Sequence, residues 1–151
     1  MSRPSVGEVP YARWEMVLMR VAFAVLIVAT IDWDTNYTTQ PKEHGFGEYV
    51  DFTFLANPDV MSVLQPLCLI GLAFYVFNLC PALALLPSLV IGVGVGTLAS
   101  SQGAVGHHTQ IVILTLLAQV AAHWTRPRLF PRLETERQAV HWSLIMVASA
   151  Y

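Results

Sequence analysis

The sequence predicts an all-α protein, a polytopic transmembrane helix bundle with four complete spans and the start of a fifth. Of its 151 residues, 55% are hydrophobic and 12% are charged, and the mean hydropathy of +0.55 lies above that of ordinary soluble domains. The charges gather at both chain ends and in a loop over residues 32–59. The apolar runs between them must be helices, because lipid cannot satisfy exposed backbone groups and barrel-like alternation is absent.

The first span is expected over about 14–31, after a segment rich in proline and glycine. Its apolar run resembles a signal peptide, but it is long for one and Arg20 interrupts it, so we interpret it as retained. An arginine inside a span either snorkels to the headgroups or pairs with another side chain of the bundle. Because Arg20 is near the end of the span, the sequence favours snorkelling.

Residues 32–59 form the main hydrophilic loop, on the outer side. Six carboxylates and Lys42, the single lysine of the chain, give this loop a net charge of −5. Aromatic residues interleave with the charges, which indicates a cap lying on the membrane interface; whether part of it is helix or strand stays open. His44 lies between two glutamates, but one histidine with dispersed carboxylates lacks a ligand spacing, so a solvated acidic loop is favoured over a metal site.

The second and third spans are expected over about 60–79 and 82–99, joined by a tight turn at 78–81. In the third, Ala84, Ser88, Gly92, Gly96 and Ser100 recur every four residues. Such a ridge of small residues lets another helix approach closely. Ser88, Gly92 and Gly96 are therefore expected to pack against a neighbouring helix, and the short turn favours the second span as that neighbour.

The fourth span, over 107–124, joins an apolar run to a polar stripe. His108, Thr115, Gln119 and His123 follow one another on one helical face. Polar groups in hydrocarbon are costly, so this stripe is expected to face other helices or a wet cavity, and it is a candidate site. The alternative is that Thr115 and Gln119 only bond a neighbouring helix, while the two histidines lie at the two headgroup levels.

His107 and His108 are the candidate catalytic residues. As neighbours on a helix they point about 100° apart, and His108 belongs to the stripe while His107 lies nearer the loop. His108 is the better candidate for a general base or a metal ligand, oriented by a carboxylate of residues 32–51. No metal site is defined by spacing, and the cofactor is unknown.

The distribution of cations predicts the topology. With a cytoplasmic N-terminus, seven of the eight lysines and arginines lie inside and only Lys42 lies outside, as the positive-inside rule requires. This arrangement predicts a multi-pass protein of the inner (plasma) membrane. The fifth span, over 139–151, stops after thirteen residues where about twenty are needed, so we interpret the chain as a fragment of a longer protein.

Residues 101–119, SQGAVGHHTQIVILTLLAQ, resemble the element of a small turn, two histidines and an apolar span in bacterial horizontally transferred transmembrane (HTTM) domain proteins, which are related to vitamin K-dependent gamma-carboxylase. Arg20 early in the first span, the outer loop, the two-span hairpin and Trp142 in the last helix agree with this resemblance. Ser100 and Ser101 depart from it, since the family carries an asparagine there. The carboxylase's lysine base has no match at Lys42, so the resemblance implies the fold and not carboxylation.

Two functions remain open. One is a membrane enzyme or redox partner with an outer-face histidine site of unknown chemistry; the other is a non-catalytic scaffold or assembly subunit that works through helix packing. The expected partners are the lipid bilayer and other helices, either of the same full-length protein or of a homo-oligomer, and no nucleic acid. A polar domain after Tyr151 with further histidines or carboxylates would favour the enzyme, and an early stop the scaffold.

The topology predicts the outcome of cysteine labelling in intact and permeabilised cells. A cysteine at Glu43 is expected to react with an impermeant reagent from outside, and one at Arg132 only after permeabilisation. Reaction of both positions from the same side would contradict the topology.

Overall fold

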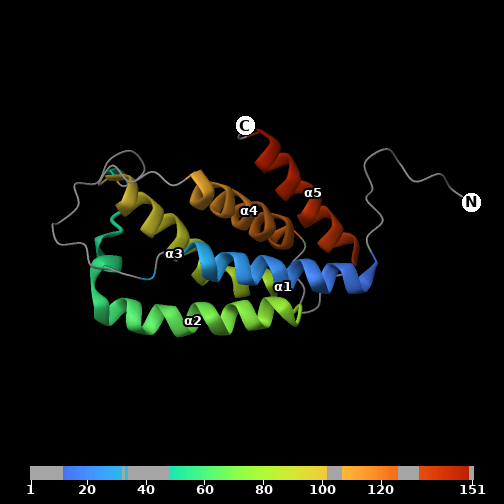
Figure 1. Cartoon of the computed structure of the whole chain (residues 1–151), viewed down its shortest axis with the longest axis horizontal. Coiled ribbons are helices and arrows are strands. Elements are labelled where there is room, and N and C mark those ends of the chain that lie inside the picture. The colour runs from blue at the N-terminus through green and yellow to red at the C-terminus, as the bar shows by residue number, and fades with distance from the viewer. Residues whose placement is uncertain (1–11, 32, 34–47, 102–106, 126–132, 150–151) are drawn as a thin grey trace, which may run out of the picture.

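The computed structural model describes residues 12–31, 33, 48–101, 107–125 and 133–149, and within these ranges every regular element is helical (Figure 1). The elements are α1 (Arg13–Thr30), the 3₁₀ helix η2 (Thr53–Ala56), α2 (Pro58–Val76), α3 (Pro81–Ser101), α4 (His107–Trp124) and α5 (Leu133–Ser149). The five helices expected from the sequence are thus present. The last one begins six residues before the expected start of the fifth span.

Local capping explains where α2 starts. The Asn57 side chain accepts a hydrogen bond from the Asp59 backbone N–H at 2.9 Å, and Pro58 occupies the first turn, where its missing N–H costs nothing.

A left-handed residue ends the same helix. Asn78 has φ 61°, its N–H donates to the Tyr75 carbonyl, and the N–H of Leu79 donates to the Phe74 carbonyl at 2.8 Å. This pair of bonds is a Schellman motif with asparagine in the place that glycine usually takes. The motif turns the chain back into α3 and fixes where the Asn78 side chain points.

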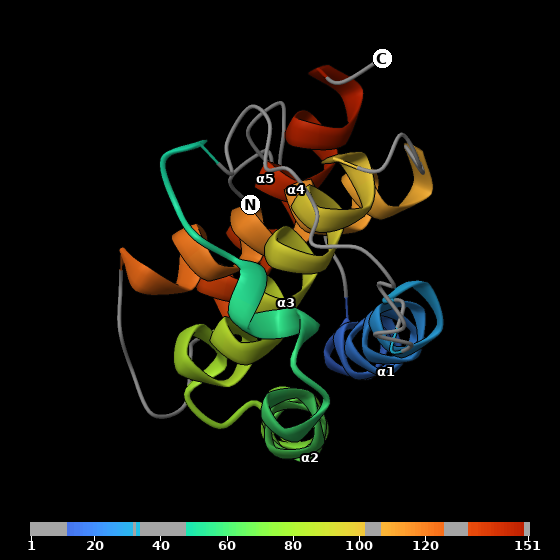
Figure 2. The same cartoon turned by 90° about the vertical axis from the view of Figure 1, so that its left-hand side faces the viewer.

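Helices that are neighbours in sequence are neighbours in space from α2 onward: α2 packs on α3, α3 on α4 and α4 on α5. The first helix packs on α2 and α4. The end-on view shows α3 in the middle of the bundle, with η2 lying across its end (Figure 2). One continuous core runs through these elements and includes Ile27 of α1, Leu55 of η2, Leu85 and Leu98 of α3, and Leu116 of α4.

The ridge of small residues packs against two helices, not one. Ala84 and Ser88 face α2: a Cβ on Gly71 would collide with the Ala84 carbonyl oxygen, and the Ser88 hydroxyl lies 3.1 Å from the sulfur of Cys68. Gly92 and Gly96 instead face α4, where both approach Ile113.

The expectation that the second span covers both glycines is therefore wrong. Residues four apart advance about 40° beyond a full turn, so the ridge rotates by about 120° from its first residue to Gly96. A straight row in sequence thus passes from one neighbouring helix to the next.

Two of the described helices are long and apolar enough to cross a membrane, as judged by length and composition: α2, and α3 over Pro81–Ala99. A shorter apolar helix covers Thr109–Trp124. The expected four complete membrane spans are therefore not supported by the length and composition of the described helices. The first helix carries three charged residues among its 18, and α5 has only 17 residues with two glutamates in its first turn.

The contact between α2 and α3 gives a stability prediction. Gly71→Val should destabilise the protein by about 1–3 kcal/mol, because the new side chain forces the two backbones apart. Ala73→Val, which adds the same residue on the exposed face of the same helix, is the control and should have little effect. Unfolding in detergent measures both variants, and equal stability of the two would contradict the close contact.

Candidate functional site

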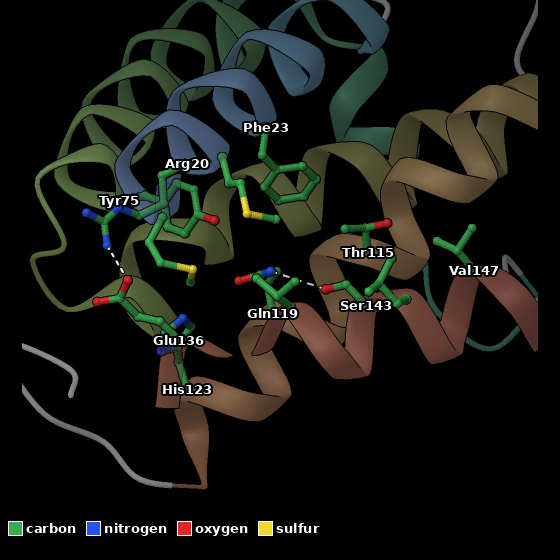
Figure 3. Close-up of a pocket in the computed structure, with 13 residues that line it drawn as sticks. Arg20, Phe23, Tyr75, Thr115, Gln119, His123, Glu136, Ser143 and Val147 are labelled. Carbon is green, nitrogen blue, oxygen red and sulfur yellow. Dashed lines mark hydrogen bonds and ion pairs between the residues drawn. The ribbon is translucent and has the colours of Figure 1, made fainter. Parts of the chain in front are cut away.

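A pocket of about 230 Å³, partly open to the outside, lies between α1, α4 and α5 (Figure 3). Its lining combines apolar side chains with most of the buried polar side chains of the described bundle. The lining residues come from α1 (Met16, Met19, Arg20, Phe23), α2 (Tyr75), α4 (Thr115, Gln119, His123) and α5 (Glu136, Val140, Ser143, Leu144, Val147).

An ion pair closes one end of the pocket. Arg20 Nη1 of α1 lies 2.7 Å from Glu136 Oε2 of α5, and the two side chains are only 11% and 9% exposed. The second carboxylate oxygen of Glu136 accepts a hydrogen bond from Asn78 Nδ2 at 2.6 Å. Glu136 therefore joins three parts of the chain, namely the first helix, the turn between α2 and α3, and the last helix.

Two further buried side chains, His123 and Tyr75, line this end of the pocket. His123 is 4% exposed, and its Nδ1 is buried without a hydrogen-bond partner in the described chain. Tyr75 is 3% exposed and is held by an edge-to-face contact with Phe23, with ring centroids 6.1 Å apart. Arg20 Nε is likewise buried and unpartnered there. Buried polar atoms without partners are uncommon in folded proteins, so this concentration marks a site for a ligand or water.

The middle of the pocket is satisfied internally. Gln119 Nε2 donates to Ser143 Oγ at 3.2 Å, and Ser143 donates in turn to the Ala139 carbonyl at 2.8 Å. Thr115 donates to the Ile111 carbonyl of its own helix at 2.8 Å. Of these bonds, the one between Gln119 and Ser143 joins α4 to α5, and the unpartnered polar atoms lie at the Arg20 end.

The structure brings together three members of the stripe expected from the sequence: Thr115, Gln119 and His123 all line the pocket. The favoured interpretation of Arg20 is corrected, because it pairs with Glu136 inside the bundle and does not snorkel. The reason is that α5 places the Glu136 carboxylate beside the arginine, which the sequence of the first span alone does not show.

Other expected site residues lie outside what the structure describes. His107 and His108 begin α4, but their side chains are not among the described ones. His44 and Lys42 fall in the part of the acidic loop that the described ranges leave out. In the described part of the chain, no group of three or more histidine, cysteine or carboxylate side chains could hold a metal ion.

Sequence reasoning missed Glu136, Asn78 and Tyr75. A signal was present for the first two, since the predicted topology places the 78–82 turn and the start of the last helix on the same side of the membrane as the N-terminus. A lone arginine in a span together with a glutamate entering another span is a pair worth testing from sequence.

His123 and Ser143 are pocket side chains of the types that act as a general base or a nucleophile. A histidine that acts as a general base is normally oriented by a second hydrogen bond, and within the described residues His123 makes none. The Ser143 hydroxyl is already engaged with Gln119 and a backbone carbonyl.

Comparison with protein-family models, with curated proteins and with solved structures gives no match. The resemblance to HTTM domain proteins therefore rests on the sequence features alone.

The ion pair predicts an asymmetric effect of substitution. Glu136→Gln should cost about 3 kcal/mol, because it leaves the Arg20 charge nearly buried and uncompensated. His141→Gln, at an exposed position on the same helix, should change stability by less than about 0.5 kcal/mol.

The double variant Arg20→Met with Glu136→Met separates pairing from packing. It should be more stable than either single substitution, because it removes both charges together. Detergent unfolding of all four proteins tests this, and simple additivity of the two single effects would show that the pair is not energetically coupled.

Proposed function

We propose that this chain is a membrane-embedded, multi-pass helical domain of the HTTM type, with its functional site in the pocket between α1, α4 and α5. The observation that carries the proposal is the apolar outer surface. Only 28% of the apolar stretch of α2 is buried inside the bundle, whereas the core helix of a soluble protein is mostly buried.

The number of exposed apolar side chains supports a membrane surround. They cover the outer faces of α1 and α2 and continue onto α3 and α5; examples with at least 44% exposure are Leu18, Val25, Val63, Leu67, Ile70, Phe74, Val90 and Ile145. Soluble monomers rarely expose apolar patches of such extent. A hydrocarbon surround gives these side chains an apolar solvent, and it also explains why the buried polar groups converge inward.

The proposal places the N-terminus and the Arg20 end of the pocket on the cytoplasmic side of the inner membrane. The charge distribution supports this orientation. The histidine pair at the start of α4 then belongs to the opposite side, because sixteen residues of helix put His107 about 24 Å from His123. Any chemistry at His107 and His108 is a second, outer-face site, separate from the pocket.

The scaffold alternative is not favoured by the packing. Its basis in the sequence was the ridge of small residues, and the described part of that ridge is covered by α2 and α4 of the same chain. It therefore offers no contact surface to another subunit.

A single substitution distinguishes a membrane domain from a soluble one. Leu67 lies at the middle of α2 and is 47% exposed, so arginine there is harmless in water but costs about 2.5–3.5 kcal/mol at the centre of a bilayer. We expect Leu67→Arg to lower the yield of folded, membrane-inserted protein strongly. Ser62→Arg, exposed one turn from the start of the helix, should be tolerated because its charge can reach the headgroups.

Alkaline extraction of membranes followed by size-exclusion chromatography measures both variants. Wild type should stay in the pellet after extraction. Release of the wild type into the supernatant, or equal yields of the two variants, would overturn the membrane assignment.

A further inference from the structure

The open hydrogen-bonding atoms of the pocket lie together at one end of it. They are His123 Nδ1 and Arg20 Nε, which have no hydrogen-bond partner among the described residues. The side chains of Tyr75, His123 and Arg20 line the pocket together. They come from α2, α4 and α1, and the two aromatic side chains are more than nine-tenths buried. An internal ligand group with a few donors and acceptors would satisfy them.

Polarity changes along the pocket. Figure 3 shows Arg20, Glu136 and His123 together at one end, Gln119 and Ser143 in the middle, and Val147 toward the other end. In the proposed topology, the polar end lies near the cytoplasmic interface and the apolar end lies toward the membrane centre. A lipid in the cytoplasmic leaflet also has its polar head at the interface and its apolar chain toward the membrane centre. It therefore matches the pocket in the order of its polar and apolar parts.

The pocket opens between α1 and α5. These two helices are not among the closely packed pairs, and Figure 1 shows α5 diverging from α1 beyond its first turns. The ion pair of Arg20 and Glu136 bridges them where they are closest. Leu144 lines the pocket and is also 53% exposed, so the opening leads into the surrounding hydrocarbon.

Charge and size narrow the class of ligand. Arg20 and Glu136 offset each other, and the remaining open groups favour an uncharged head with hydroxyl or carbonyl oxygens. A dry cavity of about 150 Å³ holds one benzene molecule, so a pocket of about 230 Å³ holds a small head and the first carbons of one chain, but not two chains.

We propose that the pocket binds an uncharged, single-chain lipid with a hydroxylated head, of the monoacylglycerol class, which enters from the bilayer between α1 and α5. The head bonds to Tyr75, His123 and Arg20, and the chain passes Leu144 and Val147 into the lipid. This inference rests on the proposed membrane function, since a soluble domain would meet no such ligand in its surroundings.

The test uses the full chain in nanodiscs with a monoacylglycerol that carries a photoreactive group on its first chain carbons. Crosslinks mapped by mass spectrometry are expected in residues 16–23 and 140–147, and excess unlabelled monoacylglycerol should abolish them. Tyr75→Phe keeps the ring and removes one hydroxyl, so the competing lipid should bind about three- to tenfold more weakly.

A matched pair of variants tests the opening. Leu144→Trp fills the entrance and should remove the saturable crosslinks, whereas Ile145→Trp, equally exposed but not lining the pocket, should leave them unchanged. Both positions lie on the outside of α5, so neither change disturbs the core. Equal labelling of the two variants would overturn the proposed entrance.

Competitor lipids test the head group. A fatty-acid anion or a lysophospholipid that displaces the probe better than the monoacylglycerol would overturn the assignment of an uncharged head. Crosslinks that are not saturable and fall on the outer face of α2 would show surrounding bulk lipid only and would overturn the site. If wild type inserts into membranes and Leu67→Arg does not, such results reject the pocket ligand alone and leave the membrane assignment standing.

Discussion

The structure depends on one ion pair between the first and last helices. Arg20 and Glu136 are separated by 116 residues of sequence, yet they meet at 2.7 Å with little exposure. Most other helix contacts among the described residues are between apolar or small residues and are weakly directional, and the polar ones, such as Gln119 with Ser143, involve uncharged groups. The pair therefore sets how α5 stands against α1, and the Asn78 side chain ties the turn between α2 and α3 to the same carboxylate.

Much of the fold follows from local sequence, because apolar runs and their polar ends are local properties. The fourth helix has the expected bounds, 107–124, since the histidine pair and Trp124 mark its ends. The last helix begins earlier than expected. The charged residues of its first turn, Glu134 and Glu136, led us to predict a polar loop there. Its polar side chains are tolerated because Thr135 and Glu136 turn inward. The prediction that α2 covers Gly92 and Gly96 was wrong, because closeness in sequence does not decide which face of α3 contacts which helix.

Part of the candidate site also follows from local sequence, and part depends on how the helices pack. The stripe of Thr115, Gln119 and His123 could be predicted because it depends on the period of one helix. The roles of Tyr75, Asn78 and Glu136 depend on how three helices stand relative to one another. The predicted topology places Asn78 and Glu136 on the same side as the N-terminus, but it does not predict that they meet. Arg20 shows the limit most clearly, because its burial is settled by a carboxylate that lies 116 residues later in the sequence.

The long separation within the ion pair also orders events during biosynthesis. At about 5–20 residues per second, α5 leaves the ribosome roughly 6–23 s after Arg20 does. In the proposed membrane domain, the arginine has no Glu136 during that interval, so its charge must stay hydrated at the membrane surface or within the insertion machinery. In this domain, α1 can therefore reach its final depth in the membrane only after α5 has been synthesised.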